Sequence, residues 1–304
     1  MPLSGNPRSI AAMLAACAMF ACMDALMKAL AGHYPPLQVT SLRGLTALPL
    51  VGLYVLWRRE FRAATGRHLR WGLHLLRGLI GVLMLALFTT SLRTLGLAEA
   101  YTLSFVAPLL VAVLAVPVLG ERVRPRHWAA IAVGFVGVVV ALRPSQMVFL
   151  SAGALAALGA AVCYAVFNVL GRLISRTEPS SSLVLWTTVC MAVFGGVLAL
   201  PQWTPVRSEH ALLLSGLAVS GFLGQLAISE AFRHGQAAAV APFEYSALAW
   251  AVLIDWLFWH AAPDPWTLAG AAIIIASGIY LVRREAPGAE QPATPAVVEV
   301  ARLK

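Results

Sequence analysis

The sequence carries little charge. Asp, Glu, Lys and Arg make up 12% of its 304 residues, half of the ~25% that is typical of a soluble domain. Hydrophobic residues make up 60% of the chain, and the mean hydropathy is +0.81. This balance leaves no room for a large soluble domain, which argues against a scaffold or sensor built on one.

Motifs of common enzyme classes are also missing. The sequence contains no HExxH, GxSxG or Walker A pattern. The seven histidines lie toward expected loops and helix ends, and the four cysteines lie in apolar segments without metal-ligand spacing. We therefore expect no enzymatic activity, no metal site and no cofactor, and a lipid-modifying membrane enzyme stays only as a remote alternative.

Long apolar runs take up most of the chain. A hydrocarbon core of ~30 Å needs ~20 apolar residues per helix, and ten stretches of the sequence approach or reach that length. The first is too long for the core of a cleavable signal peptide, so none is expected. We predict an all-α integral membrane protein with ten transmembrane helices at 10–30, 36–57, 72–93, 97–118, 127–142, 151–172, 182–200, 211–231, 237–258 and 266–283.

The positions of the basic residues predict the orientation. With the N-terminus in the cytoplasm, 14 of the 22 Lys and Arg residues fall on the cytoplasmic side, against Arg93, Arg143 and Arg207 on the other. Cytoplasmic loops of membrane proteins are enriched in Lys and Arg, so both termini are expected in the cytoplasm. The net charge of +9 then reflects orientation, with no nucleic acid as partner, and a bacterial inner-membrane location is expected.

The second half of the sequence weakly repeats the first. Asp24-x3-Lys28 aligns with Asn168-x3-Arg172 at an offset of 144, and later glycines align at offsets of 139 (Gly96 with Gly235) and 141 (Gly137 with Gly278). Five crossings per copy would invert the second copy, an arrangement common in secondary transporters. We predict a cytoplasmic N-terminus at 1–9, five-helix repeats at 10–144 and 150–284, and a disordered cytoplasmic tail at 285–304.

Ionisable residues inside predicted helices are the first candidates for a site, because each costs about 2.5–3.5 kcal/mol to insert. Asp24 and Lys28 share a face of the first helix. Arg43 in the second helix lies at a depth that matches Asp24, so the two either lock the helices together or line a cavity. Arg77 lies near the cytoplasmic end of the third helix, where it either snorkels to the interface or meets substrate.

The predicted fourth and ninth helices contain the remaining unusual groups. Glu99 opens the fourth helix, as an N-terminal acid or as a cavity residue. The segment Pro242–Tyr245 places a carboxylate and a phenol beside a proline, whose missing hydrogen bond is tolerated where a cavity replaces it. Pro108 interrupts the other half at a position that is not equivalent. Glu244 is the preferred cavity carboxylate, with a structural hydrogen bond as the alternative, and Phe243 and Tyr245 belong to the same segment. Gln225 and Glu230 of the eighth helix lie at comparable depths. Stacking and hydroxyl contacts could come from Tyr101, Phe105 and Trp250, for each of which ordinary packing is the favoured alternative.

Two groups of segments carry a family resemblance. They are Leu97–Ala100, Phe105–Leu109 and Leu119–Val123 in the first half, and Ala241–Tyr245 and Ser277–Tyr280 in the second. Over about residues 10–284 the chain resembles the EamA-type drug/metabolite transporter superfamily. Asp24-x3-Lys28, Arg43 and the Pro-Phe-x-Tyr segment are most similar to its S-adenosylmethionine and riboflavin transporters. The sequence departs from the family at Trp259–Ala262, where a second Gly-Glu signature is replaced.

The resemblance implies ten helices around a central cavity. The candidate groups on its lining helices are Asp24, Arg77, Glu99, Asn168, Gln225, Glu230 and Glu244. Because both signs of charge are present, a zwitterionic substrate fits better than a simple ion. Asp255, near the outer end of the ninth helix, is expected to face an outer vestibule.

The leading prediction is a secondary transporter that moves a small polar or zwitterionic metabolite by alternating access, with an S-adenosylmethionine-like compound favoured. An exporter of amino acids or amphipathic drugs is the alternative. The expected partners are the small-molecule substrate and the lipid bilayer. Proton coupling through Glu244 or Glu99, exchange and facilitated diffusion stay open, as do a monomer and a homodimer.

Overall fold

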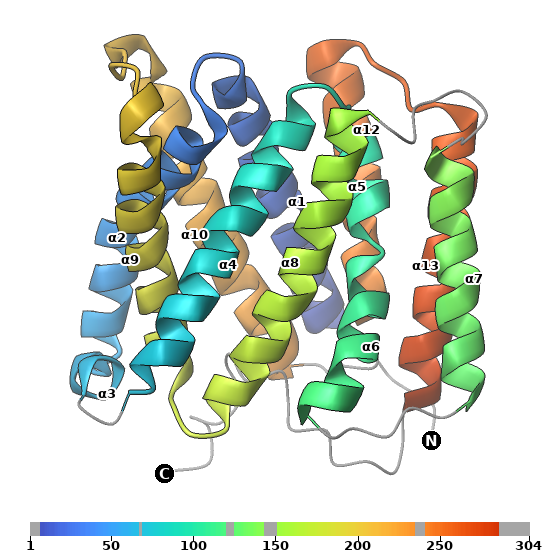
Figure 1. The fold of residues 1–304 in the computed structure, drawn as a ribbon, viewed down its shortest axis with the longest axis horizontal. Coiled ribbons are helices and arrows are strands. Elements are labelled where there is room, and N and C mark those ends of the chain that lie inside the picture. The colour runs from blue at the N-terminus through green and yellow to red at the C-terminus, as the bar shows by residue number, and fades with distance from the viewer. Residues whose placement is uncertain (1–6, 67–68, 120–124, 143–150, 235–240, 286–304) are drawn as a thin grey trace.

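The computed structural model describes residues 7–66, 69–119, 125–142, 151–234 and 241–285 (Figure 1). Within these ranges the chain is helical and contains no β-strand. The first half contains α1 (Pro7–Ala31), α2 (Pro36–Trp57), α3 (Phe61–Thr65), α4 (Trp71–Leu92), α5 (Leu97–Ser104), α6 (Ala107–Leu119) and α7 (Pro125–Leu142). The second half contains α8 (Ala152–Ser175), α9 (Ser180–Ala199), η3 (Leu200–Gln202), η4 (Ser208–His210), α10 (Ala211–His234), η5 (Ala241–Tyr245), α12 (Ser246–Trp259) and α13 (Pro265–Glu285).

Proline explains several of these boundaries. Helices α1, α2, α7 and α13 each begin at a proline, whose fixed φ suits the first turn and whose missing N–H costs nothing there. Inside a helix the proline ring clashes with the carbonyl four residues earlier. Pro108 stands four residues after Ser104, where α5 ends. The predicted span 97–118 is therefore two helices, α5 and α6.

Seven helical stretches in the described ranges are long and apolar enough to cross a membrane. They begin with α1 and include α2, α4, the α5–α6 stretch, α8, α9 with η3, and η4 with α10. Shorter apolar segments lie within α7 and α13, at Ala132–Ala141 and Pro265–Ser277. An all-helical membrane protein is confirmed, whereas the count of ten spans stays a prediction. The predicted tail after residue 285 and the first six residues lie outside the described ranges.

The long helices pack in pairs that each join the two halves of the chain. Helix α1 packs along α10, α2 along α9, α4 along α8, and α7 along α13. Figure 1 shows the α2–α9 pair at one edge of the bundle and the α7–α13 pair at the other. Close approach depends on small residues: a Cβ on Gly44 would collide with the α9 backbone, and one on Gly270 with Gly137 of α7.

The largest buried cluster lies where α1, α5 and α12 meet. It includes Met27 and Leu30 of α1, Leu97 of α5 and Ile254 of α12, all nearly inaccessible. The outward faces of the bundle are also apolar, with Leu212 81% exposed. Such surfaces are stable only when lipid covers them, which fits a membrane-embedded bundle.

Candidate substrate site and the contacts at its two ends

Asp24 and Tyr101 form the central polar contact of the bundle. The Tyr101 hydroxyl of α5 donates a hydrogen bond of 2.7 Å to Asp24 Oδ2 of α1. Arg43 of α2 lies near enough to interact electrostatically with both side chains. Its guanidinium donates to Met27 Sδ at 3.6 Å, and no direct Asp24–Arg43 salt bridge forms among the described residues. Asp24 was expected to pair with Arg43, but its carboxylate instead accepts a hydrogen bond from Tyr101.

Two interruptions of the helical backbone face each other beside this contact. Helix α5 ends at Ser104 and α6 begins at Ala107, while the five-residue η5 precedes α12. The ring of Phe105, in the first interruption, lies 5.2 Å from the ring of Tyr245, at the end of η5. These residues are 140 positions apart, between the offsets of the two glycine pairs. At this offset the two interruptions align in the sequence, although Pro108 and Pro242 do not.

Aromatic and hydroxyl groups continue the site around these interruptions. The Phe105 ring also lies 6.2 Å from the Tyr101 ring. The Ser104 hydroxyl is buried, without a hydrogen-bond partner in the part of the chain that the structure describes. Phe243 and Trp250 pack against a buried cluster that contains Met13 and Cys17 of α1. Aromatic side chains and the unpaired Ser104 hydroxyl thus lie beside the interruption between α5 and α6, within the described residues.

η5 is held on α1 by a cysteine. The Cys17 thiol donates to the carbonyl oxygens of Glu244, at 3.6 Å, and Phe243, at 3.8 Å. Glu244 is an exposed residue of η5. A carboxylate predicted to enter a cavity is therefore carried on a short irregular turn, not inside a continuous helix.

The other predicted polar residues make contacts that the structure explains locally. Glu99 Oε2 accepts the Gly96 N–H at 3.1 Å, which caps the start of α5. Glu230 pairs with Arg8 at 2.6 Å, joining α10 to α1. The Asn168 amide donates to the Tyr164 carbonyl within α8. Gln225 is partly buried on α10. None of these four side chains joins the Asp24–Tyr101 contact.

Lys28 forms a salt bridge with Asp255, which was expected from the sequence to face an outer vestibule. Its Nζ lies 2.8 Å from Asp255 Oδ1 of α12 and 4.3 Å from the centre of the Trp259 ring. Asp255 Oδ2 accepts the N–H of Ala98 at 2.9 Å. Asp255 is only 2% exposed, so the prediction that it faces an outer vestibule is wrong. The signal was available, because a lysine and an aspartate at similar depth each require a partner.

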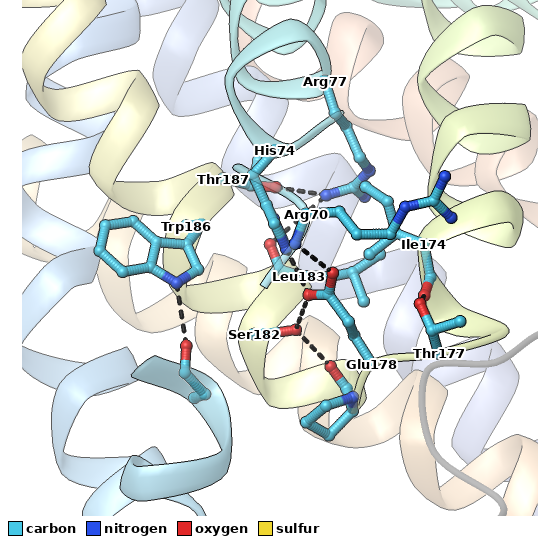
Figure 2. Close-up of polar contacts among 12 residues, drawn as sticks. Arg70, His74, Arg77, Ile174, Thr177, Glu178, Ser182, Leu183, Trp186 and Thr187 are labelled. Atoms are coloured by element: carbon cyan, nitrogen blue, oxygen red, sulfur yellow. Dashed lines mark hydrogen bonds and ion pairs between the residues drawn. The ribbon is translucent and has the colours of Figure 1, made fainter. Parts of the chain in front are cut away.

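Arg77 is fixed by the second half of the chain (Figure 2). Its guanidinium donates to the Phe167 carbonyl at 3.3 Å, to the Leu183 carbonyl at 3.4 Å and to the Thr187 hydroxyl. It also lies 3.7 Å from the centre of the Phe167 ring. The snorkelling interpretation is therefore wrong, because the charge is bound between α8 and α9.

A buried His–Glu contact lies one turn away (Figure 2) and was missed in the sequence. His74 Nε2 of α4 lies 2.6 Å from Glu178 Oε2, in the α8–α9 loop, and their side chains are 2% and 1% exposed. Glu178 also accepts the Arg70 N–H at 2.8 Å and the Ser182 hydroxyl at 3.4 Å. Burial alone would raise the pKa of Glu178, but the bonds from His74 and Arg70 hold that pKa below its ordinary value.

A shallow groove of about 370 Å³ lies apart from these groups, between α2 and α9. Its lining is mostly apolar and includes Leu45, Val193 and Val197. Across the described ranges, no three His, Cys, Asp or Glu side chains gather in a way that could hold a metal ion. The polar contacts around Asp24, rather than the groove, mark the candidate site.

Comparison with known proteins agrees with this architecture. The model of the EamA-like transporter family matches residues 7–143 and again residues 151–284. The alignment with a solved structure covers 90% of this chain and 98% of the other chain, with a TM-score of 0.60 and 23% sequence identity. This similarity shows that the two chains share a fold.

Curated relatives include transporters of different compounds. The S-adenosylmethionine uptake transporter of Rickettsia bellii is 30% identical over 70% of this chain and 72% of its own length. The riboflavin transporter of Rhizobium johnstonii is 29% identical over 76% of each chain. The pseudopaline exporter of Pseudomonas aeruginosa is 28% identical over 87% of this chain and 92% of its own. The chain therefore belongs to the EamA-like transporter family, as a multi-pass transporter of the bacterial inner membrane and not an enzyme.

Proposed function

We propose that this protein is a secondary transporter that moves a small polar or zwitterionic metabolite, with an S-adenosylmethionine-like compound favoured. The observation that carries the proposal is the Asp24–Tyr101 contact, with Arg43 nearby, beside two facing interruptions of the helical backbone. In transporters, interrupted helices at matching places in two halves mark the substrate site. The relatives named for S-adenosylmethionine uptake support the choice of compound.

The charges of the site fit an amino-acid head group. The Asp24 carboxylate would accept hydrogen bonds from an ammonium group, and the Arg43 guanidinium would bind a carboxylate in a forked geometry. The rings of Tyr101, Phe105 and Tyr245 offer faces for a planar ring or a sulfonium ion. A compound with all three features would use the whole site.

We further propose that the ten spans form two inverted five-helix repeats, at 10–144 and 150–284. The helix pairing supports this. If α1, α2, α4 and α7 correspond to α8, α9, α10 and α13, exchanging the halves turns the α1–α10 pair into the α8–α4 pair. It leaves the α2–α9 and α7–α13 pairs unchanged, and all four pairs are present.

The proposed orientation places both termini in the cytoplasm, as the arginine distribution favours. The start of α4 and the α8–α9 loop then lie on the cytoplasmic side, and the end of α12 lies on the outer side. These are the lower and upper ends of the bundle in Figure 1. Alternating access would open the two ends in turn around Asp24.

Export is the alternative direction. The pseudopaline exporter matches a larger share of this chain than the uptake transporters do. In a proton-coupled version, Glu244 would carry the proton, because it is the acidic residue of the η5 interruption. Transport that does not respond to an imposed pH gradient would exclude that version.

Counterflow of labelled S-adenosylmethionine into liposomes that hold the purified protein tests the proposal. Protein-free liposomes, Asp24→Asn and a matched control, Ser215→Ala, are measured in parallel. Ser215 is exposed, and its hydroxyl donates to the nearby Leu212 carbonyl within α10. We expect accumulation with wild type and Ser215→Ala, and at least a tenfold lower rate with Asp24→Asn.

The pattern of results separates the parts of the proposal. Equal accumulation by wild type and Asp24→Asn would contradict the assigned site. No accumulation by a folded wild-type protein would exclude S-adenosylmethionine. Riboflavin, amino acids and amphipathic compounds would then be screened for export and uptake.

A further inference from the structure

One carboxylate joins three helix ends at the upper end of the bundle. Asp255 of α12 binds Lys28, near the end of α1, through Oδ1 and the Ala98 N–H, in the first turn of α5, through Oδ2. Helices α1 and α5 belong to the first half of the chain, and α12 belongs to the second. The halves cannot separate here unless both contacts break.

The pair is enclosed as well as bonded. The side chain of Lys28 is 11% exposed and that of Asp255 is 3% exposed. The Trp259 ring lies beside the ammonium group. A Cβ on Gly96 would stand 3.0 Å from Asp255 Oδ2, so the glycine permits the close approach of α5. Two charges taken out of water in this way depend strongly on each other, because the loss of one leaves the other unpaired.

The other half of the chain has no equivalent carboxylate. At the repeat offset of 144, Lys28 aligns with Arg172, another basic residue. At the offset of 139, Asp255 aligns with Val116, an apolar residue of α6. The basic position is therefore repeated, but the acidic position is not. The Lys28–Asp255 contact therefore has no counterpart at the aligned sequence positions of the other half.

We propose that Lys28 and Asp255 form the outer gate of the transport pathway. They hold the ends of α1, α5 and α12 together in the state seen here, and the cycle opens this end by separating them. The inference rests on the proposed transport function and adds to it the group that closes one side. The Asp24–Tyr101 contact lies on the same two helices, α1 and α5, one turn from Lys28 and Ala98 respectively. It would be exposed to the outside when the gate opens.

A buried reporter cysteine tests the gate without any substrate. Ala100 lies between Ala98 and Tyr101 and is completely buried. Ala100→Cys is placed in a protein whose four native cysteines are replaced, and the rate of its reaction with a membrane-impermeant maleimide added from outside is measured. We expect Lys28→Met/Asp255→Asn to raise that rate at least tenfold. Lys28→Arg, which preserves the charge, should leave it unchanged.

A second reporter controls for access and folding. Gln202→Cys, in the exposed η3, should react at the same rate in every variant. An unchanged Ala100→Cys rate in the folded double variant would overturn the gate, whether or not the protein transports S-adenosylmethionine. A raised rate would support the gate even if that compound is not the substrate.

A cross-link tests the gate if the double variant does not fold. Lys28→Cys/Asp255→Cys, joined by a short bis-maleimide, should keep the Ala100 region closed and stop transport of whichever compound the wild-type protein carries. Undiminished transport by the cross-linked protein would overturn the proposal.

Discussion

The two ends of the bundle are closed by contacts of different chemistry. At the upper end, a lysine and an aspartate on membrane helices join α1 and α5 to α12. At the lower end, His74 of α4 binds Glu178 in the α8–α9 loop. Each contact joins the first half of the chain to the second. The two halves of the chain are therefore held together by different residue pairs at each end, and we expect each end to respond in its own way to mutation and pH.

The support around each pair differs as well. Asp255 has one further donor, the Ala98 N–H, whereas Glu178 has two, the Arg70 N–H and the Ser182 hydroxyl. A carboxylate with more donors loses less when one of them is removed. We therefore expect the upper end to be the more sensitive to loss of a single partner.

Removal of the lysine should have the largest effect. Lys28→Met leaves Asp255 buried without its counter-charge, and we expect a loss of about 3–5 kcal/mol in the free energy of unfolding. Lys28→Met/Asp255→Leu should recover most of that loss, because no charge is then buried. Thermal unfolding in detergent measures both. A double variant as unstable as the single one would show that the packing of the lysine, and not its charge, stabilises this end.

Removal of the charge at the lower end should cost less. Glu178→Gln keeps the shape of the side chain but weakens its bonds to His74 and Arg70, with an expected loss of about 1–3 kcal/mol. Glu209→Gln is the matched control, because Glu209 is an exposed partner of Arg207. The same unfolding measurement applies. If Glu178→Gln cost more than Lys28→Met, the ranking of the two ends would be reversed.

Acid should weaken the lower end in a defined range. The pKa of Glu178 in the folded protein lies below its ordinary value of 4.5. The carboxylate therefore stabilises the fold fully above that value, and the contribution disappears as the pH falls through the lowered pKa. We expect the stability difference between wild type and Glu178→Gln to shrink as the pH falls below about 5. A difference that grows in that acidic range would contradict the assigned cause.

Much of the helical framework could be predicted because apolar length and proline position act locally. The span predicted at 36–57 coincides with α2, and the one at 151–172 begins one residue before α8. Pro108 indicates a lost helical hydrogen bond in the span predicted at 97–118, but it does not by itself show that the backbone divides there into α5 and α6. The span predicted at 237–258 becomes η5 and α12 within the described residues, because the turn at 241–245 is 3-10 in form.

The sequence indicated which residues belong to the candidate site, but not which of them contact each other. Depth along a helix brought Asp24 together with Arg43, but depth does not say which way a side chain points, and the bond of Asp24 goes to Tyr101. Lys28 and Asp255 are 227 positions apart, and only the packing of α1 on α12 brings them together. Glu178 lies in a loop, so the insertion cost that identifies charges inside helices gave no signal.

An exposed pair at the lower end provides the smallest expected effect. Arg8 and Glu230 lie 2.6 Å apart and also join the halves, but their side chains are 67% and 30% exposed. Screening by solvent and the entropy of two long side chains leave such pairs worth about 0–1 kcal/mol. Arg8→Ala should therefore lower the unfolding midpoint less than Glu178→Gln does, and added salt should reduce its effect further. A loss as large as that of Lys28→Met would mean that joining the halves, and not burial of the charges, determines the strength of these contacts.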